Sequence, residues 1–216
     1  MEATADTSEK FQDPIVKKLE AAIGAENVKT SKMERLLYSH DSTGLPKEVD
    51  LGFKVVPDIV VRPSSVKEVQ EIVKIAAEAG MPITPRGAAT GYVAAGVPAA
   101  GGISIDMVGR MSKVLKIDED NMTITCQAGA SWKAVYDAAW EKGFLLGSYP
   151  SSFPNASVAG WIAMSGVGMG NYKYGSAGDN IRNMVVVVPS GAAINTGFET
   201  LADNRAGYNL YRLFVC

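Results

Sequence analysis

Residues 81–106, MPITPRGAATGYVAAGVPAAGGISID, place a loop of glycine and alanine between two short β-branched runs. In Gly87-Ala88-Ala89-Thr90-Gly91 no side chain is larger than that of threonine. A ligand can therefore approach the backbone closely, and consecutive N–H groups can converge on anionic oxygens. Arg86 adds a fixed positive charge beside this run. The stretch predicts a diphosphate pocket, with a flexible surface loop as the alternative.

The segment before this loop carries a βαβ pattern. A strand is predicted over 58–62, a helix over 65–79 and a strand over 82–84, and Ser65 and Glu68 have the spacing of a capping box. Strands joined in this way run parallel, so the loop starts where open α/β sheets bind ligands. The loop has neither the Gly-Lys-Ser/Thr of a Walker motif nor the spaced glycines of a dinucleotide-binding turn.

Periodicity and turn residues place the other elements. Helices are predicted over 13–23, 32–38 and 131–142, a half-buried strand over 103–106, and hairpins over 114–126 and 182–196. The aromatic residues of the helix over 131–142 are expected in the core rather than against a cofactor. Residues 1–12 are expected to form a mobile tail.

A second informative stretch, 148–181, reads SYPSSFPNASVAGWIAMSGVGMGNYKYGSAGDNI. Its small and turn-forming residues are too dense for an ordinary hairpin. A short helix that opens at Ser157 is expected to direct free N–H groups outward, which suits a pyrophosphate or an electron-rich ring edge. The alternative is a glycine-rich turn between packed elements.

Composition limits the class of protein. The 216 residues are 47% hydrophobic and 20% charged, which is typical of a soluble globular chain with one large or two small domains. A net charge of −2 gives no electrostatic footprint for nucleic acid or an anionic membrane. Two cysteines make no disulfide framework, and neither a signal peptide nor a membrane span is evident, so we expect a cytoplasmic protein.

These stretches resemble the FAD-binding domain of flavoproteins related to vanillyl-alcohol oxidase and p-cresol methylhydroxylase, the PCMH-type domain. The resemblance is to the branch with the glycolate oxidase D-subunit and D-lactate dehydrogenase. The family has a strand, Pro-x-x-x-Arg-Gly-x-x-Thr and a Gly-rich stretch that ends in a strand, which match 82–90 and 101–107 here. The similarity also covers 57–64, 148–181 and 207–214 in the expected order.

The resemblance implies that both loops, and the turn after the second, hold FAD. Ala159 departs from the family's first glycine and Ser165 from its usual asparagine, but both substitutes are small. Members that tether the flavin through the first loop use histidine at the position of Thr90, so non-covalent FAD is expected here. The implied cofactor-binding residues are Pro85, Arg86, Gly87, Ala88, Ala89, Thr90, Gly91, Pro150, Ala156, Ser157, Val158, Gly160, Trp161, Ser165, Gly166, Gly168, Tyr174, Gly175 and Ile181.

The resemblance implies an α+β fold with two FAD-binding subdomains. A small parallel sheet with the βαβ unit is expected to pack against a larger, mainly antiparallel sheet with helices. We expect a tail and helices over 1–50, the first subdomain over 51–112 and an incomplete second subdomain over 113–216. In the family a Gly-Ser-Glu-Gly-Thr turn and a substrate cap domain follow, so a truncated chain without the cap is expected.

The leading functional hypothesis is the FAD-binding portion of a dehydrogenase that oxidises a 2-hydroxy acid, D-lactate or glycolate, by hydride transfer to flavin N5. An iron–sulfur or electron-transfer flavoprotein subunit is the implied redox partner. The alternative is an FAD-holding electron-transfer subunit without substrate chemistry; aryl-alcohol or sugar-lactone oxidation and a non-flavin nucleotide-binding domain also stay open. The single histidine, His40, is expected at the surface. No catalytic or metal-binding residue is assigned, and these 216 residues alone are expected to be inactive.

Overall fold

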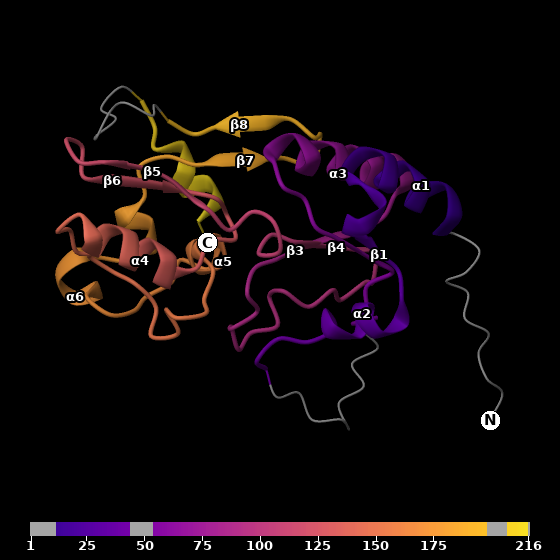
Figure 1. Ribbon diagram of the computed structural model, residues 1–216, viewed down its shortest axis with the longest axis horizontal. Coiled ribbons are helices and arrows are strands. Elements are labelled where there is room, and N and C mark those ends of the chain that lie inside the picture. The colour runs from indigo at the N-terminus through magenta and orange to yellow at the C-terminus, as the bar shows by residue number, and fades with distance from the viewer. Residues whose placement is uncertain (1–11, 44–53, 198–206, 216) are drawn as a thin grey trace. The chain divides into compact units, whose positions relative to one another are not determined.

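A computed structural model describes residues 12–43, 54–197 and 207–215 and shows a mixed α and β protein (Figure 1). The chain forms two compact units. The described parts of the first unit are 12–43, 54–85, 91–106 and 189–191, and those of the second are 86–90, 107–188, 192–197 and 207–215. The chain crosses from one unit to the other more than once. The predicted subdomain limits, 51–112 and 113–216, stay a prediction.

The first unit is built on a four-stranded sheet with the order β1-β2-β4-β3. The strands are β1 (Val28–Lys29), β2 (Ile59–Val61), β4 (Ile103–Asp106) and β3 (Ile83–Arg86). β1 is antiparallel to β2, whereas β2 and β4 run parallel with Ile59 opposite Ile103. On the other side of β4, the Ile103 N–H donates to the Pro82 carbonyl over 2.8 Å. The parallel core of this sheet confirms the predicted βαβ arrangement.

The helices of the first unit are α1 (Gln12–Ile23), the 3-10 turn η2 (Ala25–Asn27), α2 (Lys32–Leu37) and α3 (Val66–Ala79). α1 and α3 contact each other, and their apolar stripes include the fully buried Leu19 and Ile72. Gly80 ends α3 in the left-handed conformation at φ 62°. These elements follow the predicted pattern, except that Gln12, which was expected in the tail, opens α1. The remaining tail residues, 1–11, lie outside the described part of the chain.

Two local expectations are corrected. At the start of α3, the Ser65 hydroxyl accepts the Glu68 N–H as predicted, but the Glu68 carboxylate accepts the N–H of Ser64 instead of that of Ser65. β4 is buried at all four positions rather than alternating. All four side chains are buried because both faces of this strand are covered, as is usual for parallel strands, whereas alternation describes a strand with one face in water.

The second unit combines two antiparallel strand pairs with short helices. Its elements are β5 (Val114–Asp118), β6 (Thr123–Cys126), α4 (Trp132–Glu141), α5 (Val158–Ala163), α6 (Asn171–Tyr174), η3 (Ala177–Asn180), β7 (Val185–Val187), β8 (Ala193–Asn195) and η4 (Leu210–Phe214). β5 pairs only with β6 and β7 only with β8 in the described residues, so the antiparallel strands form two separate pairs. The hairpin predicted over 182–196 is present, but each of its strands, β7 and β8, is only three residues long.

The core of the second unit lies between α4 and α5. It consists of the buried residues Ala130, Trp132, Val135, Ala156 and Val158. The Trp132 ring meets that of Trp161 edge to face, with 5.0 Å between centroids. Trp132 is therefore a core residue, as predicted, whereas Trp140 at the other end of the same helix is 61% exposed and lies outside the core. None of the described helices combines the length and apolar character that a bilayer crossing needs.

Candidate cofactor site

The first predicted loop leaves β3 at a buried arginine. Arg86 is 8% exposed, and its carbonyl accepts the Met107 N–H over 3.0 Å. Three residues later, Ala89 has a φ of 54°, which an alanine adopts only at an energetic cost. The backbone therefore turns sharply directly after the buried guanidinium, and Gly87, Ala88, Ala89 and Thr90 are all half-buried.

The two predicted loops meet inside the second unit at Gly87 and Ser157. The Ala88 N–H donates to Ser157 Oγ over 3.2 Å. A Cβ atom added to Gly87 would lie 2.1 Å from Ser157 Oγ and 3.6 Å from the Cα of Gly160, and one added to Gly160 would lie 2.8 Å from the same Oγ. Only glycine fits at both positions without a shift. This close approach brings together residues that are about seventy positions apart in sequence.

The start of α5 differs from the expectation of free N–H groups. The Val158 N–H donates to the Ala130 carbonyl over 2.8 Å, and the Ala159 N–H donates to the Ala128 carbonyl over 3.1 Å. These bonds attach the helix to the turn between β6 and α4, so the first two donors are not available to a ligand. Among the described residues, no group accepts the N–H of Gly160, Gly87 or Thr90. These three donors lie on the two predicted loops.

The residues after α5 form a second close-packed turn. Ser165 has a φ of 47°, and its N–H donates to the Ile162 carbonyl at the end of the helix. A Cβ atom on Gly166 would lie 2.1 Å from the Trp161 ring nitrogen, and one on Gly168 would lie 2.2 Å from the Tyr149 carbonyl. Gly168 thereby lies against the buried Pro150, whose Cα is 3.1 Å from the same point. These glycines are needed to pack the protein against itself.

The turn that follows is held by polar side chains that sequence reasoning missed. Asp179 accepts the N–H and the hydroxyl of Ser176, each over 2.9 Å, and a hydrogen bond of 2.8 Å from Arg212. Arg212 and Ser176 lower the pKa of Asp179 to about 2. Gly175, at φ 79°, has no room for a Cβ because the Asp179 carboxylate lies 2.6 Å from that point. The Ser-x-x-Asp spacing at 176–179 was the available signal.

Other members of the predicted set have plain structural surroundings. Tyr174 is exposed, and its carbonyl accepts from Asn180 Nδ2 over 3.0 Å. Ile181 is buried directly after η3. Pro85 and Gly91 belong to the first unit. The residues that come together in the second unit are thus Gly87, Ala88, Ser157 and Gly160, while the role of each predicted residue toward a cofactor stays a prediction.

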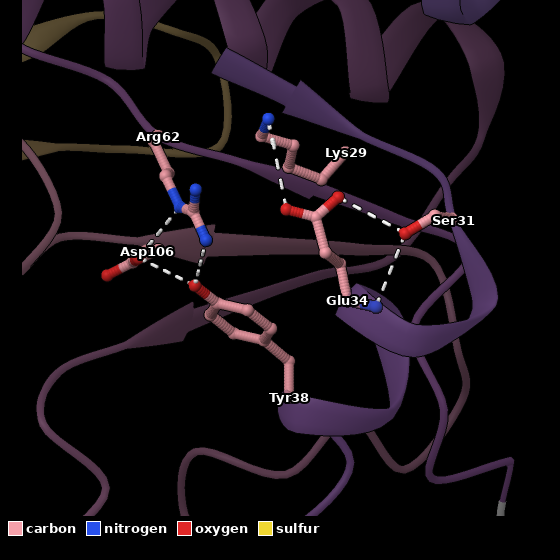
Figure 2. Close-up of polar contacts among 6 residues, drawn as sticks. All are labelled: Lys29, Ser31, Glu34, Tyr38, Arg62 and Asp106. Carbon is pink, nitrogen blue, oxygen red and sulfur yellow. Dashed lines mark hydrogen bonds and ion pairs between the residues drawn. The ribbon is translucent and has the colours of Figure 1, made fainter. Parts of the chain in front are cut away.

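A polar cluster in the first unit was also missed (Figure 2). Tyr38 Oη donates to Asp106 Oδ2 over 2.8 Å and accepts from Arg62 over 3.0 Å, and Arg62 Nε lies 3.3 Å from the same carboxylate oxygen. Burial raises the pKa of Tyr38; the hydrogen bond from Arg62 opposes this shift and Asp106 adds to it. Arg62 and Asp106 stand at the carboxyl ends of the parallel strands β2 and β4. The cluster joins these strand ends to the end of α2.

Titratable groups elsewhere provide few candidates for chemistry. Burial raises the pKa of the Cys126 thiol to about 11, so this cysteine stays protonated at neutral pH. His40 is exposed, in agreement with its predicted surface position. Within residues 12–43, 54–197 and 207–215 there is no group of three or more histidine, cysteine or carboxylate side chains that could hold a metal ion.

The geometry of the two loops fits the diphosphate of FAD. Gly87 and Gly160 let the two loops pack closely around Ser157, and their N–H groups have no partner among the described residues. The buried Arg86 begins the same loop. A diphosphate is recognised by such convergent backbone donors together with a cation. The donor set of this chain therefore suits the group that the sequence resemblance implies.

The sequence matches the FAD binding domain family over residues 57–197. Glycolate oxidase subunit GlcD from Bacillus subtilis is 35% identical over 192 residues, which are 89% of this chain and 39% of that protein. D-lactate dehydrogenase from Anaerostipes hadrus is 32% identical over 178 residues, which are 82% of this chain and 36% of that protein. The chain thus spans about two fifths of the length of these relatives.

Solved structures give the same family. An alkyldihydroxyacetonephosphate synthase matches with a TM-score of 0.78 at 28% identity, over 93% of this chain and 40% of that one. p-Cresol methylhydroxylase matches with a TM-score of 0.76 at 22% identity, over 93% and 40%, which shows a shared fold. Together with the family match over 57–197, these similarities show that the chain belongs to the FAD binding domain family, in the fold of the vanillyl-alcohol oxidase and p-cresol methylhydroxylase flavoproteins.

Proposed function

We propose that the full-length protein is an FAD-dependent oxidoreductase that oxidises a small 2-hydroxy acid of the D-lactate or glycolate type. The activities of the relatives support this, since a glycolate oxidase subunit and a D-lactate dehydrogenase each match more than four fifths of the chain. We further propose a cytoplasmic location and an iron–sulfur or flavoprotein subunit that accepts the electrons. The acidic net charge of −2 supports a partner other than nucleic acid.

One observation carries the proposal: the meeting of Gly87 and Ala88 with Ser157 and Gly160 in the second unit. Bound FAD would supply the redox chemistry as the acceptor, at flavin N5, of a hydride from the α-carbon of the hydroxy acid, while a base outside the described residues would take the hydroxyl proton. The residues of this chain would bind FAD and orient it. Gly87 and Gly160 bring the two loops together, their N–H groups would donate to the diphosphate, and Arg86 would balance its charge. We assign the remaining predicted loop residues to the same task of shaping and supporting this surface.

We propose that FAD is held without a covalent bond. The loop position at which tethering members of the family carry histidine is Thr90 in this chain. A threonine hydroxyl lacks the nucleophilic ring nitrogen that forms such a bond. Acid precipitation should therefore release the flavin into the supernatant, as measured by its absorbance, and colour that stays with the pellet would contradict non-covalent binding.

The test uses the purified full-length protein. We expect a flavin absorbance spectrum that is lost on dialysis under denaturing conditions and restored by FAD, and turnover of D-lactate or glycolate with an artificial electron acceptor. As a matched pair, Gly160→Ala should weaken FAD binding strongly because a Cβ meets Ser157 Oγ at 2.8 Å, whereas Gly178→Ala, where a Cβ meets no atom closer than 3.4 Å, should not. FAD binding without turnover of either acid would favour an electron-transfer subunit, and a colourless protein that ignores FAD would reject the proposal.

A further inference from the structure

Ser157 differs from the other serines that begin α-helices in the described chain. In three such caps the hydroxyl accepts the N–H of the third helical residue, which is the usual stabilising bond at this position. These bonds are those of Ser31 with Glu34, Ser65 with Glu68, and Ser131 with Ala134. Ser157 occupies the same position before α5 but makes no such bond. Its hydroxyl is therefore used for something other than the stability of its own helix.

The Ser157 hydroxyl instead accepts the Ala88 N–H, 69 positions away in sequence. Ser157 is 4% exposed, and the backbone on either side of it is fixed. The Trp132 N–H donates to the Ala156 carbonyl over 3.0 Å, and the Val158 N–H donates to the Ala130 carbonyl over 2.8 Å. The hydroxyl is thus held at a defined place by the core of the second unit, and it binds the loop at that place.

Gly87 leaves room for this hydroxyl because it has no Cβ atom. A Cβ atom at Gly87 would lie 2.1 Å from Ser157 Oγ, while the next atoms, Ser157 Cβ and Gly160 Cα, would lie at 3.3 and 3.6 Å. The Oγ atom is the one severe obstacle to an alanine at this position. An alanine at Gly87 would therefore have to displace the hydroxyl that holds the neighbouring Ala88 N–H.

We propose that Ser157 is a positioning residue that ties residues 87–90 to the start of α5 before the cofactor binds. This role rests on the proposed function of the two loops as the FAD site. Because the hydroxyl serves the loop, the Gly160 N–H, which a conventional cap would use, stays open beside it. A loop that is already fixed loses less conformational entropy when its ligand binds, so the tie raises affinity without contacting the ligand.

The first test measures the tie in the absence of FAD. In the full-length protein, amide hydrogen exchange at Ala88 should become roughly three- to tenfold faster in Ser157→Ala, as expected when one hydrogen bond is lost. Ser65→Ala is the matched control, because it removes an acceptor at the same distance, 3.2 Å, from a cap in the first unit. It should leave exchange at Ala88 unchanged. Equal protection of Ala88 in the wild type and Ser157→Ala would overturn the proposal.

The second test is a double-mutant cycle on FAD affinity. Ser157→Ala and Gly87→Ala should each raise the dissociation constant roughly three- to tenfold, since both remove the same tie. The double variant should be no weaker than the weaker of the two single variants, whereas independent effects would multiply. Multiplied effects would overturn the proposal. If the wild type bound no FAD, the proposed function would fail, and the exchange of Ala88 would still decide whether the tie exists.

Discussion

In the first unit the elements are joined through side chains that water does not reach, whereas the turn over 174–181 in the second unit is joined through polar side chains that water does reach. Leu19, Ile59 and Ile72 of the first unit are at most 1% exposed. The carboxylate of Asp179 and the guanidinium of Arg212 are each about half exposed. Apolar burial responds little to pH or salt, but exposed charge pairs respond to both. The two regions should therefore lose their structure under different conditions of pH and salt.

The largest effect is expected in the buried contact between α1 and α3. Ile72→Ala removes a side chain with no exposed surface and should lower the free energy of unfolding of the first unit by about 2–5 kcal/mol. The control is Leu37→Ala on α2, where the side chain is 57% exposed and the change should stay within about 0.5 kcal/mol. Urea denaturation followed by circular dichroism measures both. Similar losses for the two variants would contradict the assignment of this core.

The polar cluster of the first unit should come next. Tyr38→Phe removes the hydroxyl that donates to the buried Asp106 and accepts from Arg62, so the expected loss is about 1–2 kcal/mol. Tyr92→Phe, which changes a side chain that is 76% exposed, is the matched control and should be neutral. The same denaturation experiment applies. A neutral Tyr38→Phe would show that this cluster adds nothing to the apolar sheet beside it.

A smaller effect of opposite sign is expected at Ser165. Its φ of 47° suits glycine better than serine, so Ser165→Gly should raise the free energy of unfolding of the second unit by about 0.5–1 kcal/mol. Ala163→Gly, at the last residue of α5, should instead lower it by at most a similar amount, because glycine loses more backbone entropy than alanine on folding. Thermal unfolding of the two variants side by side gives the comparison. Destabilisation by both would mean that the serine side chain matters more than its backbone.

The smallest effect is expected at Asp179 and depends on pH. The hydrogen bond from Arg212 and those from Ser176 lower its pKa to about 2 in the folded protein, below the value of about 3.9 in an unfolded chain. The support that this carboxylate gives to the turn is therefore complete above about pH 4 and is lost as the pH falls toward 2. Amide exchange at Ser176, whose N–H donates to Asp179, should lose protection over that range. Asp179→Asn should show the weaker protection already at neutral pH and no further loss, and added salt should weaken the Arg212 contact.

Local sequence was sufficient wherever a residue's neighbours in the chain decide its structure. The helix ends at Gly80 and Gly143, both at positive φ, follow from glycine's freedom to adopt the left-handed conformation. The stripe of α3 and the hairpin of β5 and β6 follow from the spacing of apolar and turn residues. The density of small residues at 87–91 and 156–168 predicted two loops with exposed backbone. These predictions needed no knowledge of what lies across the fold.

Residue spacing alone could not place contacts between distant segments. β4 alternates in sequence, yet it is wholly buried because the fold covers both of its faces. Asp179 looks like a local cap residue, yet it also binds Arg212, 33 positions later. The Tyr38, Arg62 and Asp106 cluster likewise joins three separate segments. In each case the deciding partner is distant in the chain, and one-dimensional periodicity carries no information about it.

The sequence by itself determined the class of this protein, its two glycine-rich loops and its membership of a flavin-binding family, because those depend on composition, on local backbone freedom and on motif order. Only the tertiary structure decided how the loops are used. It directed the Ser157 hydroxyl to Ala88 instead of to its own helix, and it attached the first two N–H groups of α5 to the Ala130 and Ala128 carbonyls. A hydroxyl or an N–H group binds whichever partner the fold brings within about 3 Å, and that partner is set by packing across the whole unit.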